Sequence, residues 1–427
     1  MSAAARPRIV VTGLGFITPI GLSADAVETS LRAGRHGFVP VAWFKDCPVQ
    51  VAARVPGFDT ASSNQNVWRW PTGYDIPREA LRGLSPHGVY AFCAVEQALR
   101  DAGLKAEDLA EPTTGLFTAS GGSPGWLRTH LNEIGESQGQ RIHPLGILRT
   151  IAGTLNFNLA AHFRIQGAVT GFTSACAASA HAIGYALDEL RLGRQRRMLV
   201  VGAEEPTWET LLPFAGLRAL SRQAEPELAS RPFDRDRDGF VGSGGAAALV
   251  LETAELALAR GARIQAELAG WGQSADGHSP TQSDPGGNGL ARAMRHALAD
   301  AGVTAAQVSY VNAHATSTIA GDRSEALALR QVFASARPRI SSTKGITGHP
   351  LSASGALEAA LCTLAINRGF VPGNPHLRHP DDACAGLDLP PQTLDEAPVT
   401  VLSNSSGFGG SNVSVVLRRW EPGNATA

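Results

Sequence analysis

Cysteine is scarce in this sequence and shows no pairing pattern. Five cysteines are scattered over 427 residues, and no two of them are spaced as Cys-x-x-Cys. An odd number of scattered thiols does not fit a disulfide framework, whereas free thiols are usual in a reducing compartment. The cysteine content therefore predicts a cytoplasmic protein that folds without disulfides.

An excess of charge and long apolar runs are also missing. The 37 lysines and arginines balance 38 aspartates and glutamates, which leaves a net charge of −1. This balance argues against extended disorder and against a nucleic-acid binder, whose affinity comes largely from neutralised phosphates. No run of 18 uninterrupted apolar residues is present, so we expect no membrane span.

The N-terminus has only a superficial likeness to a secretory signal. Arg6 and Arg8 precede an apolar stretch, but Gly13 and Gly15 interrupt it. A signal peptide has a continuous apolar core. We therefore interpret Arg8–Thr12 as the first strand of the folded protein, followed by a glycine turn.

Glycine and proline, by contrast, are abundant. The chain has 47 glycines and 26 prolines, and 43% of its residues are hydrophobic. This composition is typical of a compact, turn-rich globular protein. The length predicts two or three domains, or one large fold in two parts.

Short β-branched runs alternate along the chain with longer, alanine-rich amphipathic runs. This alternation predicts an α/β protein with a mainly parallel sheet. We expect strands at residues 9–12, 115–118, 198–201, 247–251, 310–312 and 399–402. We expect helices at residues 26–33, 88–102, 179–192, 291–301, 324–333 and 354–367.

Two helix-strand units recur in the same order. The segment Glu96–Leu104 resembles Arg295–Val303, and each is followed by a predicted strand. The helix and strand in 179–201 have counterparts in 354–402. Repeats in register favour a duplicated α/β half over chance similarity of alanine-rich helices. We place the halves at residues 1–253 and 254–427, and we expect an active site between them.

Three familiar motifs fail on inspection. Asp234–Gly239 opens like a calcium loop, but its twelfth position is Gly245, where a glutamate is needed. Gly242–Ala247 matches a dinucleotide pattern but precedes a strand and not a helix. Gly121–Gly125 matches a hydrolase elbow, yet Pro124 has no N–H to offer an oxyanion.

Cys176 is a candidate nucleophile. It lies in the run Thr173–Ser179, where small residues precede a predicted helix. Small neighbours let a thioester approach the sulfur, and a helix N-terminus lowers a thiol pKa. The alternative is a buried structural cysteine, and this segment alone leaves the two readings even.

Two histidines strengthen the catalytic interpretation. His314 follows a predicted buried strand, and His349 lies in a glycine-rich turn before a predicted helix. A third turn, Asn404–Asn412, follows what we take to be the last strand and offers several N–H donors. A lone histidine is more often structural, but one cysteine and two histidines on loops of matching halves favour a catalytic site.

Together these segments resemble the β-ketoacyl-acyl-carrier-protein synthases of the type I/II elongating group, in the thiolase superfamily. The matching motifs lie at residues 10–15, 174–177, 231–240, 314–322, 342–349 and 407–412, so the resemblance covers nearly the whole chain. It implies a thiolase-like fold, in which two duplicated α/β halves form a layered αβαβα sandwich. The order Cys, His, His separates decarboxylating, elongating enzymes from relatives with a second Cys or with Cys-His-Asn.

The resemblance also implies a mechanism. Cys176 would accept an acyl chain, and malonyl-carrier protein would then lose carbon dioxide and attack the resulting thioester. His314 and His349 would stabilise the enolate, and the N–H groups of Cys176 and Phe408 would hold the acyl oxyanion. Lys344 would order the site. We expect four further substrate-site residues: Thr316, Thr318, Ser406 and Glu325.

The expected partners follow from the same resemblance. Acyl carrier protein would deliver malonyl and acyl thioesters on its own phosphopantetheine, so we expect neither a metal nor a cofactor of this chain. Arg78 and Arg82 match carrier-docking positions, although ordinary solvated charge is an equal alternative. We expect a homodimer, or a heterodimer with a Cys-less ketosynthase-like subunit, formed by pairing of the strand Met198–Val201 across a two-fold axis.

Three positions depart from the family pattern. Ala315 replaces a glycine, the run after Cys176 reads Ala177-Ala178-Ser179 where Ala-Thr is usual, and Ser406 replaces a phenylalanine that packs beside the thiol. The expected function is fatty-acid chain elongation. A ketosynthase of a specialised polyketide or polyene pathway is the alternative, and a non-catalytic chain-length-factor-like subunit is disfavoured because the nucleophile is present.

Overall fold

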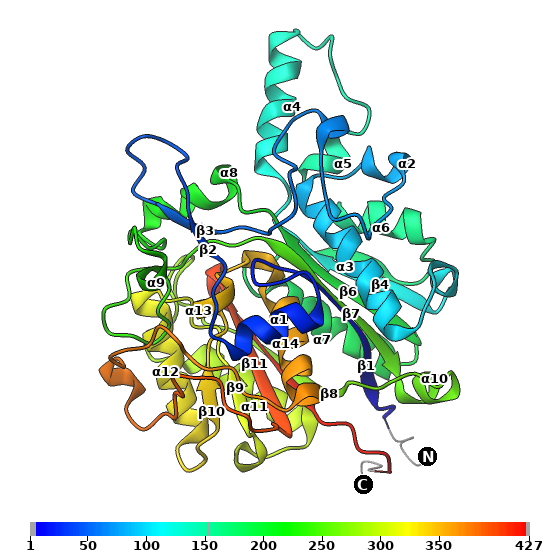
Figure 1. Ribbon diagram of the computed structural model, residues 1–427. Helices are drawn as coiled ribbons and strands as arrows, with labels where there is room; N and C mark the ends of the chain where they lie inside the picture. Colours follow the sequence, from blue (N-terminus) through cyan, green and yellow to red (C-terminus); the bar gives the residue numbers. More distant parts are fainter. Residues whose placement is uncertain (1–5, 153, 424–427) are drawn as a thin grey trace.

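A single ten-stranded sheet runs through the protein. The computed structural model describes residues 6–152 and 154–423 (Figure 1). The strand order is β10-β9-β11-β12-β8-β1-β7-β6-β4-β5. The strands are β1 (Ile9–Ile17), β4 (Thr114–Ala119), β5 (Val169–Phe172), β6 (Arg197–Glu204), β7 (Gly245–Thr253), β8 (Ala266–Ala275), β9 (Tyr310–Asn312), β10 (Arg339–Ser341), β11 (Thr400–Gly407) and β12 (Ser411–Arg418). A separate hairpin pairs β2 (Phe38–Pro40) with β3 (Val51–Ala53).

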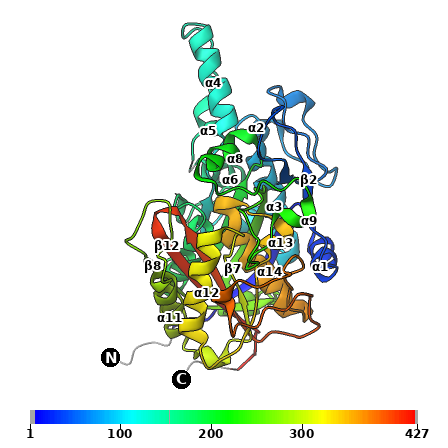
Figure 2. The ribbon, with the colours of Figure 1, turned by 90° about the vertical axis from the view of Figure 1, so that its left-hand side faces the viewer.

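The helices lie on both faces of the sheet and around its edges. The longer ones are α1 (Ala24–Arg32), α3 (Pro86–Ala102), α4 (Pro124–Glu136), α6 (Leu155–Phe163), α7 (Ala178–Arg191), α11 (Asn288–Ala301), α12 (Ile319–Phe333) and α14 (Ser354–Arg368). The shorter ones are α2 (Arg78–Leu81), α5 (Gly146–Thr150), α8 (Trp208–Leu211), α9 (Pro226–Ala229), α10 (Ala254–Ala259) and α13 (Lys344–Thr347). Helix α4 projects from the body in both views (Figures 1 and 2).

The sheet is built from two matching halves. Read from the outer edge inward, β5-β4-β6-β7-β1 and β10-β9-β11-β12-β8 have the same directions: two parallel pairings followed by two antiparallel ones. The halves join where β1 pairs with β8 over three residues. This correspondence has the form expected of a duplicated α/β half, and the division into units at residue 253 stays a prediction.

Helices complete a five-layer arrangement. Helix α3 packs on the outer face of the N-terminal strands, and α11 packs on the outer face of β8 and β12. Helices α7 and α14 contact each other and strands of both halves, so they form the middle layer. The Ser179 hydroxyl at the start of α7 accepts the Ala356 N–H of α14 at 2.9 Å. The layered αβαβα architecture predicted from the sequence is therefore confirmed.

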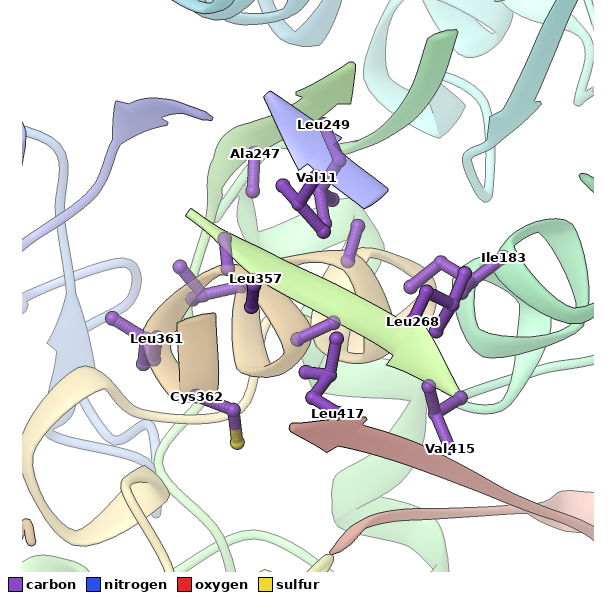
Figure 3. Close-up of a cluster of buried hydrophobic side chains, with 14 of the residues drawn as sticks. Val11, Ile183, Ala247, Leu249, Leu268, Leu357, Leu361, Cys362, Val415 and Leu417 are labelled. Carbon is purple, nitrogen blue, oxygen red and sulfur yellow. The ribbon is translucent and has the colours of Figure 1, made fainter. Parts of the chain in front are cut away.

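The largest core lies in the middle layer. Val11 and Leu249 come from the N-terminal strands, Leu268 and Val415 from the C-terminal strands, and Leu357 from α14, and all five are buried in one cluster (Figure 3). The burial of such side chains stabilises a fold by about 1.5–3 kcal/mol each. This shared core fixes the two halves relative to each other.

All six predicted strands and all six predicted helices overlap observed elements. Four strands of the sheet were not predicted: β5, β8, β10 and β12. The prediction that the strand at residues 399–402 is the last one is wrong, because β12 follows β11. The turn expected at Asn404–Asn412 is also shorter than predicted and begins at Phe408. Within the described ranges, no helix is long and apolar enough to cross a membrane.

The prediction that the strand Met198–Val201 forms the dimer contact is also wrong. Met198–Val201 lies in β6, which pairs with β4 on one side and β7 on the other. A strand with two partners has no free edge for a second subunit. The outer edge strand of this half is β5, directly before Cys176, so any sheet extension across a two-fold axis would use β5.

Gly15 provides a test of the packing between β1 and α3. A Cβ atom at this position would lie 1.9 Å from the backbone oxygen of Ala94 on α3. We expect Gly15→Ala to lower the free energy of unfolding by about 1–3 kcal/mol or more, because the helix must move outward. Gly135→Ala is the matched control, since a Cβ atom there meets nothing within 4 Å, and it should be neutral or stabilising by up to about 1 kcal/mol. Urea denaturation of both variants measures this difference, and equal effects would contradict it.

Candidate active site

Cys176 lies between β5 and α7. Its neighbour Ala175 has a φ of 49°, a left-handed conformation that costs a non-glycine residue energy. The Cys176 side chain is 9% exposed and lines two cavities, one on each side. The sulfur therefore has access to two ligand spaces at the start of α7.

His349 is the closest polar neighbour of the sulfur. Its Nε2 lies 3.1 Å from the Cys176 Sγ, and its Nδ1 lies 3.1 Å from the Ser354 hydroxyl at the start of α14. The backbone N–H of His349 donates to the Val241 oxygen at 2.8 Å. The position of the ring is thus fixed by the hydrogen bonds of the His349 backbone N–H and of its Nδ1, and Nε2 is directed at the thiol.

His314 faces the same space from the end of β9. The His314 and His349 ring centres are 5.4 Å apart, with the rings nearly perpendicular. The backbone N–H groups of His314 and Ala315 donate to the Glu325 carboxylate at 3.0 and 2.6 Å. The His314 Nδ1 is buried without a hydrogen-bond partner in the described part of the chain. The loop is therefore rigidly held, while the ring keeps a nitrogen free for a ligand.

Both imidazoles are neutral. Burial lowers the pKa of His314 well below its usual value, and the positive charge of Lys344 and the proximity of His349 lower it further. Burial and then Lys344 lower the pKa of His349 in the same way. Each ring can therefore donate one N–H and accept at its other nitrogen at neutral pH.

The thiol of Cys176 is protonated in the resting site. Burial raises its pKa to about 12, and the charge of Lys344 only partly opposes this. The sequence predicted a pKa lowered by the helix N-terminus, but desolvation of the thiolate outweighs that effect here. Activation of the sulfur therefore needs a base within reach, and the neutral Nε2 of His349 is suitably placed.

Lys344 is buried behind the two histidines. It is 1% exposed, and its Nζ forms an ion pair with Glu358 of α14. Burial raises the pKa of Glu358, and Lys344 opposes that shift. The carboxylate of Glu325 accepts from the backbone N–H groups of His314 and Ala315 and from the Asn404 amide at 3.0 Å, and the charge of Lys344 opposes the rise of its pKa on burial. The principal partner of Lys344 is Glu358.

The larger set of predicted residues surrounds a catalytic cavity of about 310 Å³. It is lined by Cys176, His314, His349, Thr316, Thr318, Glu325, Ser406 and Phe408, among others. The Thr316 and Thr318 hydroxyls lie 3.1 Å apart, and the Ser406 hydroxyl donates to the Asn412 side-chain oxygen at 2.8 Å. The structure therefore brings eight of the predicted residues into one cavity, with Lys344 behind it.

A second cavity, of about 320 Å³, begins on the other side of Cys176. Phe214, Leu351 and Phe408 line it, together with Glu204 at the end of β6. The cavity is mainly apolar, and we call it the acyl cavity. Burial raises the pKa of Glu204 to about 7, so this carboxyl is partly protonated near neutral pH.

The two predicted docking arginines lie away from these cavities. Arg78 begins α2 and Arg82 follows it, and both side chains are exposed. Neither lines the catalytic cavity or the acyl cavity. Their role in docking stays a prediction.

Three residues near the site were missed from the sequence: Glu358, Ser354 and Phe240. The sequence did contain a sign that Glu358 is unusual, because it is the one charged residue within the apolar run 355–366. Phe240 ends one of the motifs that carry the family resemblance, but its perpendicular ring contact with His349 at 5.1 Å depends on the tertiary fold. Ser354 had no signal, because its hydrogen bond at Nδ1 of His349 also depends on the tertiary fold.

The raised pKa of Cys176 leads to a testable prediction about the pH at which the thiolate forms. The free enzyme should show no thiolate below about pH 8, because its pKa lies well above that of a free cysteine. The measurement is the difference in ultraviolet thiolate absorbance between the wild type and Cys176→Ser, from pH 5 to 9. A step near pH 6–7 would instead indicate a thiolate–imidazolium pair with His349 and contradict the prediction.

Models of known families match both halves of the chain. The N-terminal domain of β-ketoacyl synthases matches residues 6–257, and the C-terminal domain matches residues 265–378. The chain is 38% identical over 417 residues to 3-oxoacyl-[acyl-carrier-protein] synthase 1 of Escherichia coli K12, covering 96% of this chain and 99% of that protein. The namesake from Haemophilus influenzae is 35% identical, with coverage of 97% and 99%.

Comparison with solved structures leads to the same family. A β-ketoacyl synthase from Burkholderia phymatum superposes with a TM-score of 0.89 and 35% identity, covering 97% of this chain and all of that one. The ishigamide ketosynthase/chain length factor superposes with a TM-score of 0.86 and 33% identity, covering 98% of this chain and all of that one. The similarity predicted from the sequence motifs is confirmed, and the chain belongs to the β-ketoacyl synthase family, with a thiolase-like fold.

Proposed function

We propose that this protein joins an acyl group carried on Cys176 to a malonyl thioester of acyl carrier protein, with loss of carbon dioxide. The observation that carries the proposal is the position of the sulfur, which lies 3.1 Å from a neutral histidine and between two cavities. The chain is a condensing acyltransferase of the 3-oxoacyl-acyl-carrier-protein synthase type, as predicted from the sequence. Its relatives of that name support a role in fatty-acid chain elongation.

The first step transfers the acyl group to the enzyme. The Cys176 sulfur attacks the thioester carbonyl, and Nε2 of His349 accepts the thiol proton. The N–H groups of Cys176 and Phe408 are proposed to hold the oxyanion; the loss of one such donor typically slows a reaction about 10²- to 10³-fold. The bond to the carrier thiol breaks, that sulfur takes the proton, and the acyl chain extends into the acyl cavity.

The second step breaks the bond to the malonyl carboxylate. Carbon dioxide leaves, and the electron pair becomes an enolate whose oxygen needs hydrogen-bond donors already in place. His314 and His349 are neutral and line the same cavity, so each can donate an N–H. The Ser354 hydroxyl can accept from Nδ1–H of His349 in the first step and donate to Nδ1 in this step, so Nε2 can first accept a proton and then donate one. The enolate carbon then attacks the thioester, the bond to the Cys176 sulfur breaks, and the departing thiolate takes a proton from solvent.

The arm that delivers both thioesters is proposed to be the phosphopantetheine of acyl carrier protein. Thr316 and Thr318 line the catalytic cavity, and their hydroxyls suit the amides of such an arm. The chain itself would then need no cofactor. Arg78 and Arg82 are the proposed docking charges, because the carrier is acidic in this family. A solved complex at 26% identity is described as a ketosynthase with its acyl-carrier protein.

We also propose a dimer. Strand β5 is one of the two edges of the sheet, the one in the half that carries Cys176, and pairing with a second β5 would cover its unpaired backbone groups. A homodimer is the simpler arrangement. A heterodimer with a Cys-less subunit is the alternative, and one relative is described as the ishigamide ketosynthase/chain length factor. The cytoplasmic location expected from the cysteines stays a prediction.

One observation favours a second candidate, a ketosynthase of a specialised polyketide or polyene pathway. Ser406 lines the catalytic cavity where a phenylalanine was expected, and its hydroxyl is satisfied by Asn412. A small residue with its polar group turned to a neighbour leaves room near the sulfur. That room suits a rigid, unsaturated acyl chain.

The nucleophile assignment is tested by Cys176→Ala. We expect this variant to lose condensation by about 10³-fold or more and to retain malonyl decarboxylation, because the histidines serve that step without the thiol. His349→Ala should lose both activities. Cys47→Ala, which removes another thiol, should keep both. Product mass spectrometry and carbon dioxide release measure the two reactions; condensation by Cys176→Ala would refute the assignment and support a non-catalytic role for this thiol.

The pathway alternative is tested by Ser406→Phe. An open space beside the sulfur predicts that the variant still accepts saturated acyl groups from carrier protein but loses conjugated ones. Filling an already packed site would cost about 1–3 kcal/mol of stability and lower activity with every substrate. The measurement is the acylation rate of Cys176 with both substrate types. Equal losses would remove Ser406 as a determinant of specificity.

A further inference from the structure

A third cavity, of about 520 Å³, lies apart from the catalytic chemistry. It is formed by the segments around and after β3, the beginnings of α3 and α4, and the segment from the end of β6 into α8. Helices α4 and α8 are in contact and lie in the upper part of Figure 1. The cavity shares no lining residue with the catalytic cavity and only Glu209 with the acyl cavity. Its volume is in the range of small-molecule sites.

Aromatic rings form much of its wall. They are Trp43, Phe58, Tyr90, Trp126 and Trp208. Only 6% of the chain is aromatic, so five rings around one cavity are a marked concentration. The face of an aromatic ring carries partial negative charge and attracts cations.

A buried carboxylate with an unused oxygen borders the same cavity. Glu205 is 1% exposed, and its Oε1 accepts a hydrogen bond from the Ser123 hydroxyl at 2.6 Å. Its Oε2 has no hydrogen-bond partner among the described residues. The His87 Nδ1, at 3.9 Å, is beyond hydrogen-bond distance. A buried oxygen of this kind is costly unless a donor reaches it.

Neighbouring charges do not neutralise this carboxylate. Arg128 lines the cavity but is paired with Glu209 at 2.8 Å and lies over the Trp208 ring. Asp59 and Arg54 are both exposed at its edge. Burial raises the pKa of Tyr90, and the charge of Glu205 raises it further. The lining therefore has three carboxylates against two guanidinium groups, with the innermost carboxylate unpaired.

We propose that this cavity binds a small organic cation, an ammonium group on an aromatic or aliphatic stem, with the cation at Glu205 and the stem between the rings. An ammonium group would donate to the unused Oε2, and the aromatic walls would favour both its charge and its apolar stem. The site is independent of the condensation chemistry. Nothing in it requires Cys176 or a thioester.

The test uses benzylammonium chloride as the probe and benzyl alcohol as its neutral counterpart. Calorimetry on the full chain should give saturable binding of benzylammonium, at least tenfold tighter than that of benzyl alcohol. Glu205→Gln should weaken benzylammonium at least tenfold. Glu136→Gln, which removes an exposed carboxylate of α4 outside the cavity, should change it less than twofold. Equal binding of both probes, or unchanged binding by Glu205→Gln, would overturn the proposal.

Two further measurements keep the result unambiguous. If Glu205→Gln does not fold, as judged by circular dichroism, Trp208→Leu replaces it and should weaken benzylammonium at least threefold; unchanged binding there would overturn the proposal. The rate of Cys176 alkylation by iodoacetamide should be the same with and without saturating benzylammonium. Slower alkylation would place the probe at the catalytic thiol and refute a separate site.

Discussion

The active site depends on the close contact between α7 and α14 in the middle layer. A Cβ atom at Gly355 of α14 would lie 2.4 Å from the backbone nitrogen of Ala180 on α7, so the two helices approach as closely as glycine allows. Cys176 lies just before α7, and His349 lies shortly before α14. The 3.1 Å between sulfur and imidazole is therefore set by helix packing, and the loops only complete it. A larger residue at 355 would act on catalysis by moving two helix ends apart.

A buried positive charge on α13, paired with Glu358 of α14, lies close to the groups that the proposed chemistry makes negative. Lys344 lowers the pKa of both histidines and opposes the raised pKa of the Cys176 thiol. A neutral imidazole can donate to an enolate and accept from a thiol, whereas an imidazolium could only donate. Thiolate and enolate are both anions, so one fixed cation favours each in turn. Its own burial is compensated by Glu358, since an unpaired buried charge would be strongly destabilising.

Much of this site could be predicted from local sequence. Cys176, His314 and His349 each lie at the end of a regular element among small residues, and the motifs around them are specific in combination. Glu358 lies inside a helix and reveals its role only through the partner that folding brings to it. Strand β8 was missed because its alanines and glycines have weak strand preference, and it forms by pairing with β12 across more than a hundred residues of chain. Strand β12 was missed although its valines favour a strand, because the segment before it was interpreted as a turn after the last strand. The thiol pKa was mispredicted because burial depends on the whole fold, whereas the helix terminus is visible locally.

Duplication explains why the sulfur has a cavity on each side. The two halves have the same strand order, so the segment before α7 corresponds to the segment before α14, and the end of β4 corresponds to the end of β9. Cys176 and His349 thus face each other from equivalent places. The equivalent strand ends differ in chemistry: β9 leads into His314 and its threonines, whereas β4 leads into Ser120 and Gly121 beside the acyl cavity. A symmetric scaffold with asymmetric loops therefore gives the nucleophile one polar side, suited to an amide-bearing arm, and one apolar side, suited to a growing chain.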